Sequence, residues 1–159
     1  MLSDAYAAGF FDGEGGVALN GTRRVGTGRT NRRIDHIRWT RRAYVGNTDV
    51  CVLGSLRARF GGTTVPWNRG QEGRKPVYMW NIYNARMVAF LEAIRPHSIV
   101  KARRIDLLLE FCSTLQRSGS RGLPEGVAKR RVQIYEELRL LNHRGTASID
   151  QLSLQRLRA

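Results

Sequence analysis

The chain has 159 residues and a mass of 18.0 kDa, the size of a single domain. Lys and Arg number 27 against 13 Asp and Glu, which gives a formal net charge of +14. This charge excludes an acidic disordered chain and favours a polyanionic partner such as nucleic acid, because phosphate contacts release counterions. No apolar run reaches the roughly 20 residues of a membrane span, and no signal peptide is evident. We therefore expect an intracellular protein with no membrane partner.

Cysteine and lysine are both scarce. Cys51 and Cys112 are too few for a disulfide framework, and neither has a Cys or His at metal-ligand spacing, so a structural zinc is not expected. Only three of the basic residues are lysines: Lys75, Lys101 and Lys129. A lysine at a site-like position is therefore of interest.

Hydrophobic periodicity and Gly/Pro breaks divide the chain into short elements. The first helix has Ser3 or Asp4 as its expected N-cap, and the second has Asn47 or Thr48, with Asp49 in its first turn. In chain order, the patterns predict a helix over 3–14, strands over 16–24 and 35–46 around a Gly- and Arg-rich loop over 25–34, a helix over 48–60, strands over 63–68 and 76–83, and helices over 84–94, 96–116 and 125–143.

Runs of strands between helices indicate an α+β fold rather than alternating βαβ units. We expect an αββαββα order with an antiparallel sheet and additional C-terminal helices. Residues 1–145 form the single expected domain, and 146–159 form a C-terminal tail. Within the second strand, alternation separates an apolar face, which Arg41 interrupts, from a polar face. The apolar face carries Ile37, Trp39, Ala43 and Val45, and the polar face carries His36, Arg38, Thr40, Arg42 and Tyr44.

The first helix has an unusual stripe of small residues. Ala5, Gly9 and Gly13 recur at i, i+4 and i+8, although glycine inside a helix costs about 1 kcal/mol relative to alanine. Such a stripe permits the close approach of another helix. It ends in Asp12-Gly13-Glu14, so two such helices side by side would bring two carboxylates together. Paired carboxylates repel unless a cation neutralises them, and Mg²⁺ held by oxygen ligands suits a site beside a phosphate.

Residues 7–15, AAGFFDGEG, resemble the signature helix of the LAGLIDADG homing endonucleases. The resemblance implies that Glu14 binds the catalytic metal, that the carbonyl of Gly13 is a further ligand, and that Asp12 is structural. It also implies a saddle-shaped antiparallel sheet whose first two strands lie in the DNA major groove. The order of predicted elements agrees with this family over residues 3–145.

Two further positions match the family pattern. Asn47 lies where the family has a polar residue that orients water, although an N-cap role is an equal alternative. Lys101, which follows Pro96, matches a basic residue near the scissile phosphate, and its alternative is a solvated helix residue. The resemblance thus implies catalytic roles for Glu14, Asn47 and Lys101.

The strand faces and loops supply the expected DNA contacts. Arginine can bind the O6 and N7 atoms of guanine, and phosphate contacts position the protein. The candidate DNA-binding residues are Asn20, Thr22, Arg24, Arg29, Arg32, Arg33, Arg38, Thr40, Arg42, Tyr44, Arg69, Arg74 and Lys75.

One copy of the motif in 159 residues implies a homodimer with Ala5, Gly9 and Gly13 at the twofold interface. The expected function is a metal-dependent double-strand break in a long, near-palindromic DNA target, the activity behind intron homing. Mg²⁺ or Mn²⁺ is the expected cofactor, with Ca²⁺ binding without cleavage. Two alternatives stay open: an intron RNA maturase, with host intron RNA as a partner, and a non-catalytic DNA-binding protein on the same fold. The expected location is the cytoplasm of a prokaryote or an organelle.

Overall fold

A computed structural model describes residues 2–27, 33–68, 75–115 and 124–143, with side chains for all of these except 23–27 and 33–36. Over these residues the fold is α+β in the predicted order, which confirms the expected class. The elements are α1 (Asp4–Glu14), β1 (Gly15–Thr27), β2 (Arg33–Asn47), α2 (Val50–Phe60), β3 (Thr63–Asn68), β4 (Val77–Tyr83), α3 (Asn84–Ile94), the 3-10 helix η1 (Arg95–His97), α4 (Ala102–Ser113) and α5 (Glu125–Asn142).

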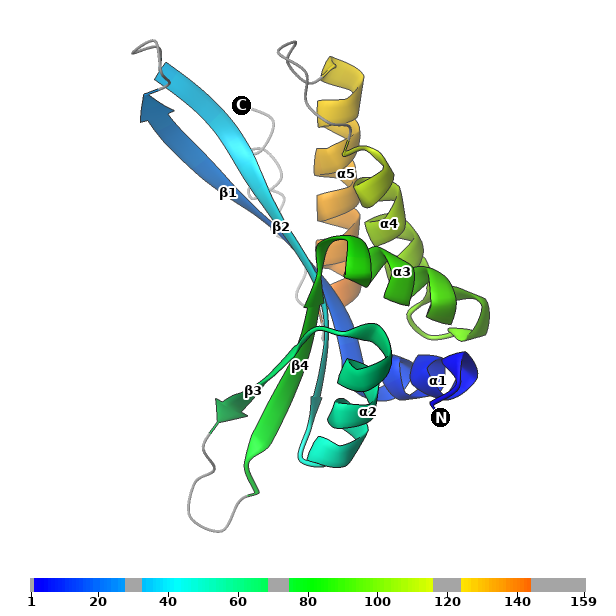
Figure 1. Cartoon of the computed structure of the whole chain (residues 1–159). Coiled ribbons are helices and arrows are strands. Elements are labelled where there is room, and N and C mark those ends of the chain that lie inside the picture. Colours follow the sequence, from blue (N-terminus) through cyan, green and yellow to red (C-terminus); the bar gives the residue numbers. More distant parts are fainter. Residues whose placement is uncertain (1, 28–32, 69–74, 116–123, 144–159) are drawn as a thin grey trace.

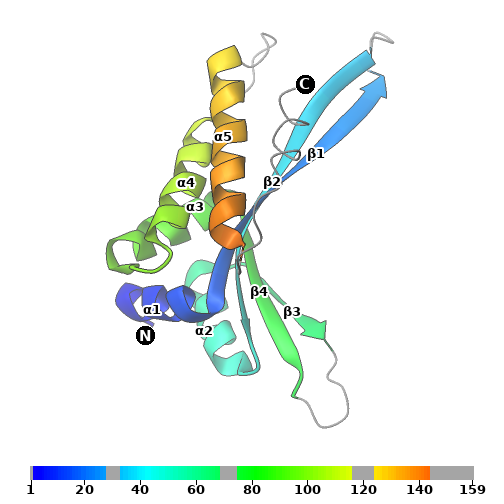
Figure 2. The same ribbon diagram turned by 180° about the vertical axis from the view of Figure 1, so that it is seen from behind.

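The four strands form one antiparallel sheet with the order β1-β2-β4-β3. The helices of the described residues lie on one side of this sheet, and its two hairpins, β1–β2 and β3–β4, point in opposite directions (Figure 1). The view from behind shows the same separation of helices and hairpins (Figure 2). The other face, which no helix of the described residues covers, is called the open face below.

Alternation along the strands explains why only one face is covered. Val17, Ala43 and Ile82 share one row of the register, and all three are buried against the helices. Neighbouring positions such as Asn20 and Thr40 point to the open face and are exposed.

Aromatic residues fill the core between the sheet and α1, α2 and α3. The ring of Phe90 makes edge contacts with Phe11, Phe60 and Trp80 at centroid distances of 5.4, 4.9 and 5.1 Å. Trp80 is fully buried, and its indole N–H donates to the carbonyl of Gly61 at 2.8 Å. Trp80 is therefore a core residue, as its apolar surroundings in the sequence indicate.

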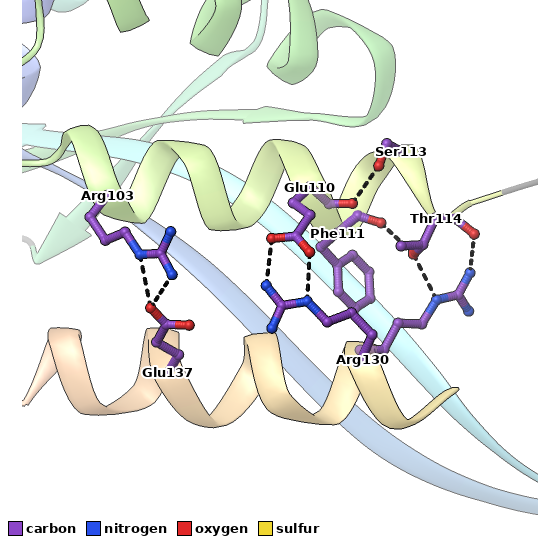
Figure 3. A network of polar contacts seen from close by, with 8 residues as sticks. Arg103, Glu110, Phe111, Ser113, Thr114, Arg130 and Glu137 are labelled. Atoms are coloured by element: carbon purple, nitrogen blue, oxygen red, sulfur yellow. Dashed lines mark hydrogen bonds and ion pairs between the residues drawn. The ribbon is translucent and has the colours of Figure 1, made fainter. Parts of the chain in front are cut away.

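Helices α4 and α5 support the long β1–β2 hairpin. Arg130 forms two hydrogen bonds with Glu110, and Arg103 pairs with Glu137, so polar contacts join the two helices along their length (Figure 3). Trp39 of β2 packs on Phe111 of α4 and Tyr135 of α5, with centroids 5.2 and 5.5 Å apart. The helix pair therefore fixes the base of the hairpin.

Two predicted segments differ from the structure, the loop over 25–34 and the helix over 96–116. The first two strands extend into the segment predicted as a loop, because pairing continues as far as Thr27 and Arg33. The helix predicted over 96–116 is broken: η1 ends at His97, and α4 begins only at Ala102. The intervening backbone N–H groups bind Asp12 instead of continuing a helix.

Two expectations concern the remainder of the chain. The predicted tail over 146–159 lies outside the described residues, as does the domain end at 145. No helix in the described ranges is long and apolar enough to cross a membrane.

Phe90→Ala should lower the free energy of unfolding by about 3–5 kcal/mol, because it removes the ring that contacts three other aromatic residues. Leu140→Ala is the matched control, since Leu140 is 48% exposed, and a loss under about 1 kcal/mol is expected. Urea unfolding followed by circular dichroism measures both values. Equal losses in the two variants would contradict this description of the core.

Candidate active site

Helix α1 has one buried side and one bare side. Ser3 caps it, its hydroxyl accepting from the N–H of Tyr6, while Ala7, Ala8 and Phe11 face the core. On the opposite side the stripe of Ala5, Gly9 and Gly13 is exposed. A Cβ atom built at Gly9 or Gly13 would meet no atom of the described structure within 4 Å. The stripe is therefore a smooth surface with room for a second backbone.

The first residue of β1, Gly15, has no space for a side chain. A Cβ atom at Gly15 would lie 2.3 Å from Cδ2 of Phe11, so the buried Phe11 ring occupies this space. The N–H of Gly15 also closes the helix by donating to the carbonyl of Phe11. The chain thus turns from helix to strand without a loop, and Glu14, the last helical residue, is exposed where α1 meets the sheet.

The carboxylate of Asp12 holds the segment before α4. It accepts hydrogen bonds from the hydroxyl of Ser98 at 2.5 Å and from the backbone N–H groups of Ile99, Val100 and Lys101 at 2.6, 3.0 and 3.1 Å. Partial burial raises the pKa of Asp12, but these hydrogen bonds together outweigh it and bring the pKa below its ordinary value. Asp12 therefore has the structural role that the sequence predicts.

Lys101 is held at the C-terminal end of α1. Its ammonium group donates to the carbonyl of Phe11 at 2.9 Å and to the carbonyl of Asp12, and the residue is only 9% exposed. A cation at a helix C-terminus is stabilised by the helix dipole and by carbonyls that have no partner within the helix. The alternative of a solvated helix residue is therefore wrong, and the structure brings Lys101 to the same helix end as Glu14.

Asn47 lies at the same end of the sheet as Glu14. Gly15 pairs with Val45, and Asn47 is two residues further along β2. Its side-chain oxygen accepts from the N–H of Asp49 at 2.8 Å, and Asp49 caps α2 through the N–H of Cys51. The expected N-cap at Asn47 or Thr48 is wrong by one or two residues, because the Asn47 side chain forms a turn before the cap.

A single chain gives an incomplete set of metal ligands. The described residues contain no group of three or more His, Cys, Asp or Glu side chains that could hold a metal ion. Glu14 supplies one exposed carboxylate, and the carbonyl of Gly13 is among the last four of the helix, which lack intrahelical partners. Both are hard oxygen donors of the kind that Mg²⁺ prefers, so the donor chemistry fits, and a second copy of the chain would double it.

The open face begins beside Glu14 and carries the predicted strand residues. Asn20 and Thr22 of β1 face Thr40 and Arg38 of β2, and all four are exposed. Further towards Glu14, the Arg42 guanidinium lies 4.9 Å from the ring centroid of Tyr44 and donates to Asn81 at 3.2 Å. The structure thus brings these residues to one polar surface.

The loop residues are less completely described. Lys75 is exposed just before β4. Arg24 and Arg33 lie in β1 and β2, but their side chains are outside the described part, and Arg29, Arg32, Arg69 and Arg74 lie outside the described residues altogether.

Two residues on the strands were missed from the sequence. Asn81 is a buried polar residue at 5% exposure, and Trp67 of β3 is an aromatic residue with 62% exposure. A single Asn within the apolar run 77–83 was the available signal for the first. Arg41 lies on the helix side, as the interrupted apolar face indicates, and its buried Nε has no hydrogen-bond partner among the described residues.

Neither a scan of protein-family models nor a search of curated proteins gave a match. A comparison with solved structures did give matches. The archaeal intron-encoded homing endonuclease I-Vdi141I, complexed with DNA, is 18% identical and has a TM-score of 0.63, covering 97% of this chain and 92% of its own. The homing endonuclease I-CvuI, in complex with its target in the presence of Ca, is 16% identical with a TM-score of 0.63, covering 96% and 90%.

A third solved structure has a different length. The LAGLIDADG meganuclease I-AabMI, bound to uncleaved DNA, is 14% identical with a TM-score of 0.61, and the match covers 97% of this chain but only 48% of the other. These likenesses confirm, at the level of the fold, the resemblance carried by residues 7–15. The chain has the fold of the LAGLIDADG homing endonucleases.

Asp12→Asn should lower the free energy of unfolding at pH 7 by about 1–3 kcal/mol, because it removes the charge that accepts four hydrogen bonds. The folded-state pKa of Asp12 is below its ordinary value, so this stabilisation is present above about pH 4 and is lost as the pH falls through the folded pKa. Urea unfolding at pH 7, 5 and 3 should show the difference between wild type and variant shrinking. A difference that stays constant with pH would contradict the role of the carboxylate.

Proposed function

We propose that this protein is a site-specific homing endonuclease that acts as a homodimer and makes a metal-dependent double-strand break in a long, near-palindromic DNA target. The observation that carries the proposal is the position of Glu14. Its exposed carboxylate lies at the end of the bare stripe of α1, at the helix end held by Lys101, and at the start of the open face. One residue thus borders a surface for a second chain and a surface for DNA.

The surface of α1 supports the homodimer. Large apolar side chains are exposed around the small-residue stripe: Tyr6 at 56%, and Ile99 and Val100, on the segment bound by Asp12, at 85% and 68%. A stripe without side chains, flanked by exposed apolar groups, suits a second copy of the same helix. The chain matches 92% of the length of I-Vdi141I but only 48% of the length of I-AabMI. This difference in length supports a chain that provides one half of a twofold assembly.

The catalytic roles follow from position. The Glu14 carboxylates and Gly13 carbonyls of two copies would hold Mg²⁺ or Mn²⁺, which when bound supplies Lewis-acid polarisation of the scissile phosphate and lowers the pKa of a bound water. The Lys101 ammonium group, bound to carbonyls of α1, acts through its positive charge, which lies at the same helix end as Glu14 and favours negative charge on the phosphate. Asn47, at the same end of the sheet, orients the attacking water through its amide N–H groups, since its oxygen is bonded to the turn.

The open face supplies recognition. A net charge of +14 provides affinity for phosphates that does not depend on base sequence. Arg38 and Arg42 on β2 supply guanidinium groups that can discriminate bases in the major groove. The structures of I-Vdi141I with DNA and I-CvuI with its target support duplex DNA as the partner.

Glu14→Gln should abolish cleavage, with at least a 100-fold loss of rate, while DNA affinity changes little, because the substitution removes one metal-binding charge at constant size. The substrate is a duplex recovered from a randomised library by binding in Ca²⁺ and then cut with Mg²⁺. Glu92→Gln, at an exposed position on α3, is the matched control and should cut normally. Normal cleavage by Glu14→Gln would overturn the metal assignment.

Gly9→Gln should convert the protein from a dimer to an 18.0 kDa monomer, because the new side chain meets nothing in its own chain but would separate two α1 helices. Gly54→Gln is the matched control: Gly54 is an exposed helical glycine with equally open surroundings in the described structure. Analytical ultracentrifugation measures the mass of each variant. A dimeric Gly9→Gln protein would contradict the proposed interface.

A further inference from the structure

Four residues interlock on the open face next to Glu14. In the strand register Gly16 pairs with Tyr44, and Tyr44 pairs with Asn81, so β1, β2 and β4 each contribute one residue to a single row. Arg42 is two residues along β2 from Tyr44 and points to the same face. This row is two residues beyond Glu14 in the chain, so the cluster borders the candidate active site.

The missing side chain of Gly16 determines where Tyr44 lies. A Cβ atom at Gly16 would be 2.7 Å from the hydroxyl oxygen of Tyr44 and 2.8 Å from Cζ, so the ring crosses the bare backbone of β1. The Arg42 guanidinium carbon is then 4.9 Å from the ring centroid, within the range of a cation–π interaction. Tyr44 therefore supports one side of the Arg42 guanidinium.

Asn81 holds Arg42 from β4. Its Oδ1 accepts from Nη1 of Arg42 at 3.2 Å, and its Nδ2 donates to the carbonyl of Met79 at 3.3 Å. Both ends of the amide are thus engaged, and Asn81 is only 5% exposed within a strand whose neighbours are apolar. Burial of an amide costs free energy unless its hydrogen bonds are made, so the contacts with Arg42 and Met79 offset the cost of burying Asn81 in the strand.

The consequence is an arginine that is fixed before any ligand binds. Among the described residues, Arg42 makes one hydrogen bond, the bond to Asn81, which uses one of its five N–H donors. The remaining donors suffice for a bidentate contact with O6 and N7 of guanine. Because the side chain is already ordered, binding loses less conformational entropy.

Resting on the function proposed above, we infer that Asn81 is a positioning residue that fixes Arg42 to read a guanine near the centre of the DNA target. Arg38, four residues away on the same face, is exposed. Four residues of strand span about 13 Å at about 3.3 Å per residue, close to four base pairs at about 3.4 Å each. Arg42 and Arg38 therefore read positions about four base pairs apart in each half-site, with Arg42 nearer the centre.

The test is the base preference at each position of the target, measured by sequencing duplexes that the full-length protein binds in Ca²⁺. Arg42→Ala should lower the preference for guanine at one inner position by about tenfold. Asn81→Leu should lower the preference at that same position, leave the Arg38 position unchanged, and add little in combination with Arg42→Ala. Asn81→Asp, which keeps an acceptor oxygen for Arg42, should retain the preference.

Melting temperature, measured beside the base preferences, distinguishes a positioning role of Asn81 from a purely structural one. Cleavage with Mg²⁺ tests the proposed function separately. If Asn81 is merely structural, Asn81→Leu lowers the melting temperature and weakens every position equally, and the inference is overturned. An unchanged profile for Asn81→Leu, with Arg42→Ala altered, also overturns it. If the predicted profiles are found but no variant or wild type cuts DNA with Mg²⁺, the inference stands and the proposed nuclease activity fails.

Discussion

The carboxylate of Asp12 is the constraint on which the geometry of the candidate active site depends. Its four hydrogen bonds, from Ser98 through Lys101, tie the end of α1 to the start of α4. They determine where the backbone of Lys101 lies. Its ammonium group therefore reaches the carbonyls of Phe11 and Asp12 near the end of α1. The same bonds hold Ile99 and Val100 beside the helix with their apolar side chains exposed. One cluster of hydrogen bonds therefore organises both the candidate active-site end of α1 and the proposed dimer surface.

The charged side chains differ between the two faces of the sheet. On the helix side, carboxylates pair with arginines: Asp106 with Arg95, Glu110 with Arg130. Such partly exposed pairs contribute modestly to stability, but they neutralise arginines that would otherwise repel one another. On the open face, Arg38 is exposed, and Arg42 is hydrogen-bonded to the neutral amide of Asn81, which leaves its positive charge uncompensated by that partner. The excess positive charge can therefore act where the sheet is uncovered.

Local signals predicted most of the fold, because each arises within one element. Ser3 caps α1, and the apolar alternation of β2 faces the helices, as predicted. The break between His97 and Ala102 was missed because its cause, Asp12, lies about 90 residues away in the sequence. Periodicity assigns a helix to such a segment and takes no account of a distant carboxylate that competes for its N–H groups.

The candidate site could be predicted only in part, for a similar reason. The motif at residues 7–15 makes Glu14 a candidate metal ligand, and the scarcity of lysine draws attention to Lys101, whose place at the same helix end the structure shows. Asn81 was missed because an apolar strand pattern gives no indication that one polar member contacts Arg42 across the sheet. The pairing of Glu14 with a second copy is a property of two chains, so it stays a proposal that the small-residue stripe supports.

The proposed function is tested most directly by the DNA ends that the wild-type protein produces from a randomised duplex library with Mg²⁺. A homing endonuclease produces cuts in both strands, at one long near-palindromic site, and these cuts disappear when EDTA removes the metal. Tight, salt-sensitive binding without cut ends in Mg²⁺ or Mn²⁺ would contradict it and would show that the fold serves as a nucleic-acid-binding protein.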